Sequence, residues 1–227
     1  MIPNLYIVDY PNRSDYAEAA VIKVEYDYDK CVHCPQCGDR VSGAYWKRPR
    51  EVVLTKRNAP DFLYAYCDNA PFVISEKALE IIRQAGLTGI EKAEEIEFVR
   101  YQRNSKKEIP IPKYYHIKLA RSRMTIDHTH SVISYGSPYG SAKDAGGCSL
   151  CRQVPRTYDF FRSLAFHTDK YEGYDIFQTY EMCNTVFLSQ RFVDVCKAND
   201  LTNLRFDPAQ KHGQWTAAYF LDGNEDV

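Results

Sequence analysis

Two short cysteine motifs lie far apart in the chain, CPQCG at residues 34–38 and CSLC at residues 148–151. Each places two thiols on a tight turn, where their sulfurs come about 3.5–4 Å apart, as in a zinc knuckle. In the first motif Pro35 restrains the turn and Gly38 tolerates the positive φ that follows. Two such knuckles predict one four-cysteine site with a structural Zn²⁺ as cofactor. The predicted ligands are Cys34, Cys37, Cys148 and Cys151.

The cysteines also permit other interpretations. CVHC at residues 31–34 is an overlapping CxxC, so Cys31 and His33 are further candidates. A redox pair is a second alternative, but a thioredoxin-like CxxC opens a helix after a strand, and two glycines precede Cys148. Inert buried thiols are a third. The remaining cysteines lie in apolar runs and are expected in the core: Cys67, Cys183 and Cys196.

A shift of 114 residues places the first cysteine pair on the second, and it lays Asp61–Ile90 over Asp175–Leu204 without a gap. Chance would supply about two identities, since a typical residue makes up roughly 5–7% of such a composition. The shift places Cys31 on Ala145, and therefore selects the Cys34 and Cys37 register. We interpret the chain as an internal duplication. Five positions are identical: Asp61/Asp175, Tyr66/Tyr180, Ser75/Ser189, Leu87/Leu201 and Thr88/Thr202.

Each half of the repeat predicts a short strand followed by a helix. In the first half, residues 72–74 form the strand, Ser75 caps the helix, and Gly86 ends it in the left-handed conformation with Leu87 folding back. In the second half, Ser189 is the cap, and the helix ends at Asn199 or Asp200. Alternating character predicts further strands at Glu95–Tyr101, Tyr115–Leu119 and Asn203–Phe206. The N-terminal runs Leu5–Val8 and Val21–Tyr28 are also expected to be strands.

These elements predict an α+β fold, in which two related strand–helix repeats are joined through a zinc-ribbon-like site of four cysteines. The expected divisions are an N-terminal half at 1–120, a linker with glycines and histidines at 121–147, and a C-terminal half at 148–227. All three are expected to form one compact unit. The 18 tyrosines of the chain favour β-structure.

Composition argues against some classes of partner. With a net charge of −1 in 227 residues, no general field draws the protein to nucleic acid or to an anionic membrane. No apolar run approaches the ~18 residues of a membrane span, and the N-terminus lacks a basic signal-peptide region. We therefore expect a cytoplasmic protein. The basic stretch Lys47–Arg57 near the first knuckle supports one alternative function, a zinc-ribbon nucleic-acid-binding or regulatory protein.

Catalytic signatures are weak. The segment DHTH at residues 127–130 places His128 and His130 on one side of an expected strand, where they can bind a metal or act as acid and base. No third ligand stands at a helpful spacing, so we interpret them as polar linker residues. Gly136–Gly147 matches no nucleotide-binding loop. We find no Ser/His/Asp or Cys/His signature and predict that the protein is not an enzyme.

The order of motifs resembles the double-CXXCG motif family, found as many paralogues in myxobacteria and similar to polymorphic-toxin immunity proteins. Arg152 stands where the second motif of that family carries glycine. The resemblance implies an immunity protein that binds a cognate secreted toxin in the cytoplasm of its producer and neutralises it. Exposed tyrosines and acidic residues are the expected anchors, in stretches such as Glu91–Glu97 and Tyr158–Tyr180. The matching stretches are residues 34–38, Phe72–Gly89, Cys148–Cys151 and Asp175–Phe206.

Overall fold

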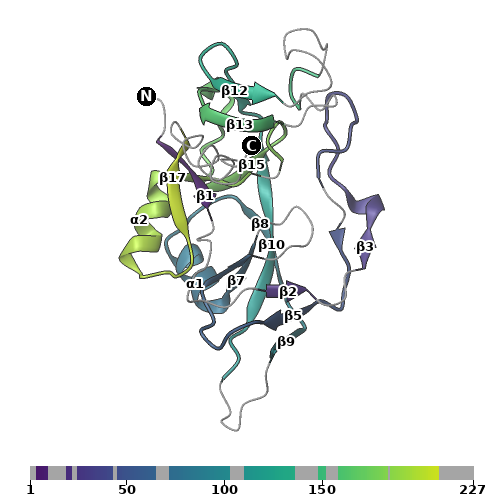
Figure 1. Ribbon diagram of the computed structural model, residues 1–227, viewed down its shortest axis with the longest axis vertical. Coiled ribbons are helices and arrows are strands. Elements are labelled where there is room, and N and C mark those ends of the chain that lie inside the picture. Colours follow the sequence, from purple (N-terminus) through teal and green to yellow (C-terminus); the bar gives the residue numbers. More distant parts are fainter. Residues whose placement is uncertain are drawn as a thin grey trace, which may run out of the picture.

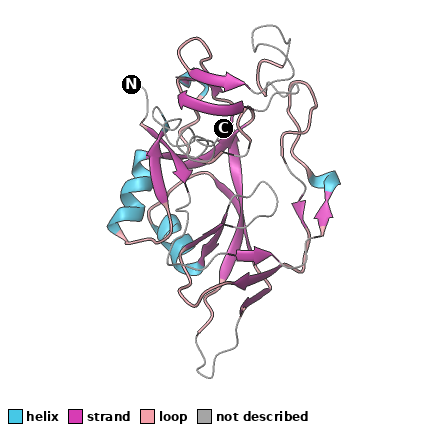
Figure 2. Ribbon diagram, in the orientation of Figure 1, coloured by secondary structure: helices cyan, strands magenta, loops and turns pink. Residues whose placement is uncertain are grey.

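The computed structural model describes residues 4–9, 19–21, 25–42, 45–64, 72–102, 110–135, 148–151, 158–183 and 185–209. Within these ranges the fold is mixed α+β, with many strands and two nine-residue helices, α1 (Glu76–Gln84) and α2 (Gln190–Ala198) (Figure 1 and Figure 2). The predicted α+β class is confirmed. Neither helix of the described part is long and apolar enough to cross a membrane.

One curled eight-stranded sheet organises the molecule. Its strands follow the order β17-β1-β16-β15-β10-β7-β6, and β8 pairs with β10 beside this path. The long strand β10 pairs with β7 near its start and with β15 near its end. The pairing with β15 is parallel, and all the other pairings of this sheet are antiparallel. Its strands are β1 (Leu5–Asp9), β6 (Phe62–Tyr64), β7 (Phe72–Ser75), β8 (Ile90–Glu95), β10 (Tyr114–Ser122), β15 (Ile176–Thr179), β16 (Phe187–Ser189) and β17 (Arg205–Pro208).

The described residues also form four smaller sheets. Three strands pair as β2 (Ala19–Val21), β5 (Glu51–Leu54) and β9 (Phe98–Tyr101). The three two-stranded sheets join β3 (Tyr26–Asp27) to β4 (Tyr45–Trp46), β11 (Thr125–Ile126) to β14 (Phe166–His167), and β12 (Val132–Tyr135) to β13 (Tyr158–Ser163). Two 3-10 helices follow β3 and β14, η1 (Tyr28–Lys30) and η2 (Thr168–Lys170).

The ends of α1 follow from its sequence. Ser75 lies in extended conformation and its hydroxyl accepts a hydrogen bond from the N–H of Ala78, satisfying a donor that the helix itself leaves unpaired. At the other end Gly86 has φ +61°, and the N–H of Leu87 donates to the carbonyl of Ile82. This is the Schellman arrangement that glycine favours. Both predicted ends are confirmed.

The second helix begins and ends in the same way with different residues. The hydroxyl of Ser189 accepts from the N–H of Phe192. Asn199 is the C-cap, Asp200 has φ +48°, and the N–H of Leu201 donates to the carbonyl of Cys196. The predicted cap at Ser189 and the predicted end at Asn199 or Asp200 are therefore confirmed.

Both helices cover one face of the large sheet. A single hydrophobic cluster contains the inward residues of α1, among them Leu79 and Ile82, and those of α2, among them Phe192 and Val193. Alternate strand residues point to the opposite face, where two further clusters lie against the small sheets. In β16, for example, Leu188 belongs to the helix-side cluster and Phe187 to the opposite one. Burial of apolar side chains on both faces explains why the central strands are rich in them.

Two of the predicted strands need correction. Val21–Tyr28 is not one strand, because β2 ends at Val21, β3 covers two residues, and Tyr28 begins η1. Glu95–Tyr101 is divided as well. The N–H of Ile96 still donates to the carbonyl of Tyr114 beside the large sheet, whereas β9 begins at Phe98 and pairs with β5 in the small one. Alternating character does not specify which sheet a strand joins. Leu5–Val8 and Tyr115–Leu119 lie within β1 and β10, as predicted, and only Arg205 and Phe206 of the segment predicted at Asn203–Phe206 lie in β17.

The proposed division at residues 121–147 stays a prediction. Its described part, up to residue 135, holds the end of β10 and the strands β11 and β12. Gly136–Gly147, the position of Arg152 and the expected core residue Cys67 lie outside the described residues.

Candidate metal centre

The structure brings the four predicted cysteines together. Their sulfur atoms all lie within 4.8 Å of one another. Across the two motifs, the sulfurs of Cys34 and Cys148 are 3.7 Å apart and those of Cys37 and Cys151 are 3.5 Å apart. These separations exceed the ~2.05 Å of a disulfide bond, and the described cysteines are free thiols. The residues come from segments separated by more than a hundred positions, so their meeting is a property of the tertiary fold.

The first knuckle is built by a short hairpin. The N–H of Cys34 donates to the carbonyl of Asp39, and the N–H of Gly38 donates back to the carbonyl of Cys34. Gly38 has φ +80°, the conformation that a side chain would oppose. His33 and Arg40 form an antiparallel bridge just outside this turn. Proline and glycine thus position the two thiols as the sequence predicted.

The second knuckle meets the first directly. The side-chain amide of Gln36 donates to the hydroxyl of Ser149 across the two motifs. The N–H of Leu150 points at the sulfur of Cys148 at 3.4 Å, a contact that stabilises a thiolate. Leu150 and Val41 also pack in a small hydrophobic cluster with Cys34 and Cys151. Two of the four sulfurs are therefore shielded, while Cys37 remains exposed.

Electrostatics show how crowded the four thiols are. Burial opposes ionisation of Cys148, but the N–H groups of Cys151 and Leu150 and the neighbouring thiols lower its pKa to about 7. For Cys37 the N–H of Asp39 acts to lower the pKa, yet partial loss of hydration and the thiols of Cys34 and Cys148 raise it above its ordinary value. Without a cation, one thiolate therefore makes the next harder to form. A divalent metal ion removes that conflict.

The donor set fits zinc. Sulfurs at ~2.3 Å from a tetrahedral ion are about 3.8 Å from one another, close to the separations across the motifs. Four thiolates are the ligands of a closed structural site. Cys31 is buried but lies outside the four-cysteine group, as does His33. Within the described ranges, no second group of potential ligands of this kind occurs.

A second set of contacts links the same two halves of the chain. The carboxylate of Asp61 accepts hydrogen bonds from Ser75 at the start of α1, and from both the N–H and the hydroxyl of Thr202 after α2. Lys77 is 3.4 Å from the same carboxylate. We call Asp61 and its partners the first latch. It ties one helix start to the loop that follows the other helix.

The second latch, around Asp175, has the same plan. Asp175 accepts from Ser189 at the start of α2, and from both the N–H and the hydroxyl of Thr88 after α1. Arg191 lies 3.1 Å from it, in the place that Lys77 has in the first latch. Both carboxylates are almost fully buried. Three of the five residue pairs that are identical under the 114-residue shift thus belong to the latches. The sequence showed that these residues recur, but it did not show that they bind one another.

A comparison with models of known protein families shows to which family the chain belongs. The model of the Imm11 immunity protein family matches residues 17–211. The chain belongs to this immunity protein family. No curated protein matches the chain. Family membership implies a toxin protein as the partner of this Imm11 protein. The resemblance to immunity proteins is confirmed at that level, and membership of the double-CXXCG family stays a prediction.

The two histidines considered for chemistry lie in a turn of this Imm11 protein, so the predicted strand is wrong there. Asp127 folds back to accept the N–H groups of Thr129 and His130, which prevents an extended conformation. The ring of His128 is bonded to Glu181 at 2.5 Å, and that of His130 to Asp127 at 2.6 Å. Each histidine therefore has its own carboxylate, and the two do not form a joint ligand set within the described residues.

A hollow of about 460 Å³ lies between the two helices of the Imm11 protein. Its lining is mainly apolar, with Ile81 from α1, Ala85 at the end of that helix, and Val195 and Ala198 from α2. Asp194 is the one titratable side chain in the lining. This arrangement offers no pair of groups for acid–base or nucleophilic catalysis.

Proposed function

We propose that this Imm11 protein protects the cell that makes it by binding a cognate secreted toxin, one to one, in the cytoplasm. The observation that carries the proposal is the match to an immunity protein family over residues 17–211. Neutralisation by binding needs a rigid scaffold and a complementary surface rather than a reaction centre. We propose accordingly that the protein turns over no substrate.

The scaffold, in our proposal, is stapled by one zinc ion at Cys34, Cys37, Cys148 and Cys151. The clustering of the four sulfurs supports this assignment. A closed site of four thiolates leaves no open coordination position for water or substrate, so its contribution is to stability. The ion would close a loop of more than a hundred residues, which in the unfolded chain is costly in entropy.

We further propose that the two strand–helix units derive from one duplicated unit. The 114-residue shift relates the cysteine pairs, the helix caps and both latches. It also relates the left-handed residues Gly86 and Asp200 after the helices. A duplication explains why contacts between the halves come in pairs.

The alternative function, zinc-dependent binding of nucleic acid, receives no support from the basic stretch after the first knuckle. Arg50 is fully buried, and Arg48 is paired with Glu97 at 3.0 Å. A continuous run of phosphates is disfavoured where carboxylates lie beneath the cations, as Glu97 does beneath Arg48. A protein partner fits the arrangement better.

Co-expression provides the test. The product of the gene adjacent to this chain's gene is expressed alone and together with the Imm11 protein, and growth and complex formation are measured. We expect growth arrest by the neighbour alone, rescue by co-expression, and a 1:1 complex on size exclusion. Rescue without a complex would indicate enzymatic antagonism, and absence of rescue would remove the immunity proposal for that pair.

A further inference from the structure

Arg50 forms the centre of a polar cluster between β4, β5 and β8. Its guanidinium is fully buried and donates to the carbonyl of Trp46 and to the carboxylate of Glu94. The hydroxyl of Tyr45 accepts from the same guanidinium and donates to Glu94. The basic stretch Lys47–Arg57 therefore contains one arginine that supports the interior of the protein.

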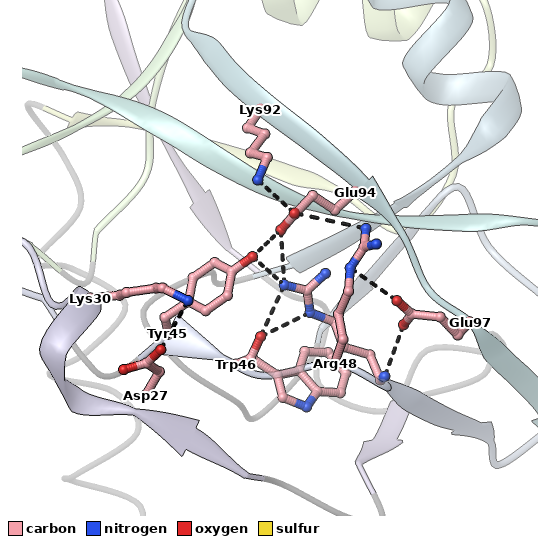
Figure 3. Close-up of polar contacts among 9 residues, drawn as sticks. Asp27, Lys30, Tyr45, Trp46, Arg48, Lys92, Glu94 and Glu97 are labelled. Carbon is pink, nitrogen blue, oxygen red and sulfur yellow. Dashed lines mark hydrogen bonds and ion pairs between the residues drawn. The ribbon is translucent and has the colours of Figure 1, made fainter.

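Glu94 and Glu97 are turned into this cluster. Figure 3 shows Glu94 in contact with Lys92, Tyr45 and a guanidinium, and Glu97 beside Arg48. Burial alone would raise the pKa of Glu94, but Lys92, Tyr45 and Arg50 together lower it to about 2. The acidic stretch Glu91–Glu97 was expected as an anchor for the partner. At these two positions the carboxylates instead hold the cluster together.

The ion pairs of this region are layered, with cations outside and carboxylates inside. Lys30 has 62% of its side chain exposed and Asp27 18%. Lys92 has 59% exposed and Glu94 11%. For Arg48 and Glu97 the values are 54% and 28%. An incoming molecule therefore meets three cations first, although the cluster contains a similar number of acids.

Layered pairs also occur singly elsewhere, at Lys77 with Asp61, Arg191 with Asp175 and Arg100 with Glu51. Two further surface pairs lack this layering. Lys113 is 57% exposed and its partner Glu76 is 44% exposed. Lys118 is 54% exposed and Glu91 46%. In the pairs Lys113–Glu76 and Lys118–Glu91 the two charges are similarly exposed to water, so their electrostatic fields at the protein surface largely cancel.

Aromatic side chains lie beside the outer cations. The ammonium of Lys30 is 5.2 Å from the ring centre of Tyr45, and the guanidinium of Arg50 is 5.2 Å from the same ring. Tyr28, two residues before Lys30, is 64% exposed and lies 6.2 Å from the ring of Tyr26. Tyrosine and arginine are the residues that most often carry the energy of protein interfaces.

We propose that Tyr28, Lys30, Arg48 and Lys92, which we call the Tyr28 face, form the surface that binds the toxin, and that the toxin presents an acidic patch to it. This inference rests on the proposed immunity function. The supporting network of Arg50, Tyr45 and Glu94 holds the face in place before binding, which lowers the entropy lost in the complex. The inner carboxylates disfavour a polyphosphate backbone, so a protein with a few placed carboxylates is the better partner.

The test compares matched charge reversals. Lys30→Glu and Lys92→Glu change exposed side chains of the Tyr28 face, and Lys113→Glu is the control with the same exposure elsewhere. Each variant is titrated with the purified product of the adjacent gene, and circular dichroism checks its fold. We expect the two face variants to bind at least tenfold more weakly and with a smaller dependence of association rate on salt, while Lys113→Glu binds like wild type.

A second pair of variants addresses the aromatic part. Tyr28→Ala is expected to weaken binding at least tenfold, and Ile111→Ala, another exposed apolar residue, is expected to leave it unchanged. Wild-type affinity in all variants would overturn this inference and leave the immunity function standing. Failure of the wild-type protein to bind would remove both. Binding of a labelled 20-base-pair DNA at 150 mM salt that Lys92→Glu abolishes would overturn the choice of a protein partner.

Discussion

Asp61 joins the start of α1 to the loop after α2, and Asp175 joins the start of α2 to the loop after α1. The two latches thus cross between the halves of the chain, and neither half contains a complete one. The cysteine pairs behave in the same way, since each sulfur contact joins residue 34 or 37 to a residue 114 positions later. Each of these contacts therefore stabilises one half through the other.

The loops after the helices show where the halves differ. Gly89 has φ +112°, and a Cβ there would lie 1.8 Å from the carbonyl oxygen of Ile176. At the corresponding place in the other half stands Asn203, whose side-chain amide donates to the carbonyl of Phe62 at 2.7 Å. Glycine permits direct approach to the backbone of Ile176, whose N–H donates to the carbonyl of Thr88, whereas Asn203 reaches the other half with its side chain. One junction is therefore tighter than the other.

The neighbouring strands differ as well. In the first unit β10 lies between β7 and β8, and in the second unit β1 lies between β16 and β17. Strand β1, at the N-terminus, thus occupies the same position in the second unit that β10 occupies in the first. At matching positions His116 pairs with Val73 and Ile7 pairs with Phe187. A buried polar ring stands where the other unit has a plain apolar residue.

Removal of one cysteine should have the largest effect. Cys148→Ser is expected to lose the metal and to lower the free energy of unfolding by roughly 4 kcal/mol or more, the value for a crosslink that closes a loop of ~100 residues. Zinc content and urea unfolding are the measurements. Cys31→Ser is the matched control, since Cys31 lies outside the cluster, and loss of zinc in that variant would show that the register is wrong.

The latches should be equivalent in strength. Asp61→Asn and Asp175→Asn each leave buried donors with a poorer acceptor, and we expect each to cost about 2–4 kcal/mol. In double-mutant cycles, Asp61 should couple to Thr202 and Asp175 to Thr88. Chemical denaturation of the single and double variants provides the values. Additive effects within a latch would contradict the proposed contacts.

The buried histidine of the first unit, His116, should make the stability of the protein depend on pH, and the second unit has no histidine at the matching position. Burial and the nearby Arg50 lower the pKa of His116 to about 4, from an ordinary value near 6.5. The unfolded chain then binds a proton that the folded protein excludes, so stability is full above pH 6.5 and falls as the pH drops toward 4. The total loss should reach up to about 3 kcal/mol.

His116→Ile, which copies Ile7 of the other unit, should remove this part of the pH dependence. Urea unfolding of both proteins at pH 7 and pH 4.5 is the measurement. The nitrogen Nε2 of His116 has no hydrogen-bond partner among the described residues, so the substitution breaks none at that atom. Parallel stability curves for the two proteins would refute the account of His116.

Loss of a helix cap should have the smallest effect. Ser75→Ala and Ser189→Ala each remove one acceptor from a helix start and one donor to a latch carboxylate, at a cost of about 1–2 kcal/mol. Thermal unfolding should show similar shifts for both. A cost at Ser75 well above that at Ser189 would indicate that the two units are not equivalent.

Local features could be predicted because they depend on few residues. Serine at a helix start and glycine or asparagine at its end act over one turn, so the bounds of α1 and α2 were close to correct. The meeting of the cysteines followed from motif spacing and the repeat. The identities at Asp61, Ser75 and Thr88 pointed to the latches without revealing their contacts.

Contacts between distant segments escaped prediction. Nothing in the run Lys47–Arg50 states that Arg50 is internal, because its burial depends on Glu94 from β8 and on the carbonyl of Trp46. The same holds for the exchange of the chain between sheets at Ile96. An alternating polar pattern predicts a strand but does not show which strand will pair with it. A charged residue in the sequence likewise does not show which residue of opposite charge will neutralise it.

The most direct test of the account is X-ray absorption at the zinc edge of protein purified without chelators, together with elemental analysis. We predict one zinc per chain with four sulfur ligands at about 2.3 Å. Cys31→Ser should leave the spectrum unchanged. Absence of zinc, or a shell that contains nitrogen ligands, would contradict the four-cysteine staple between the halves.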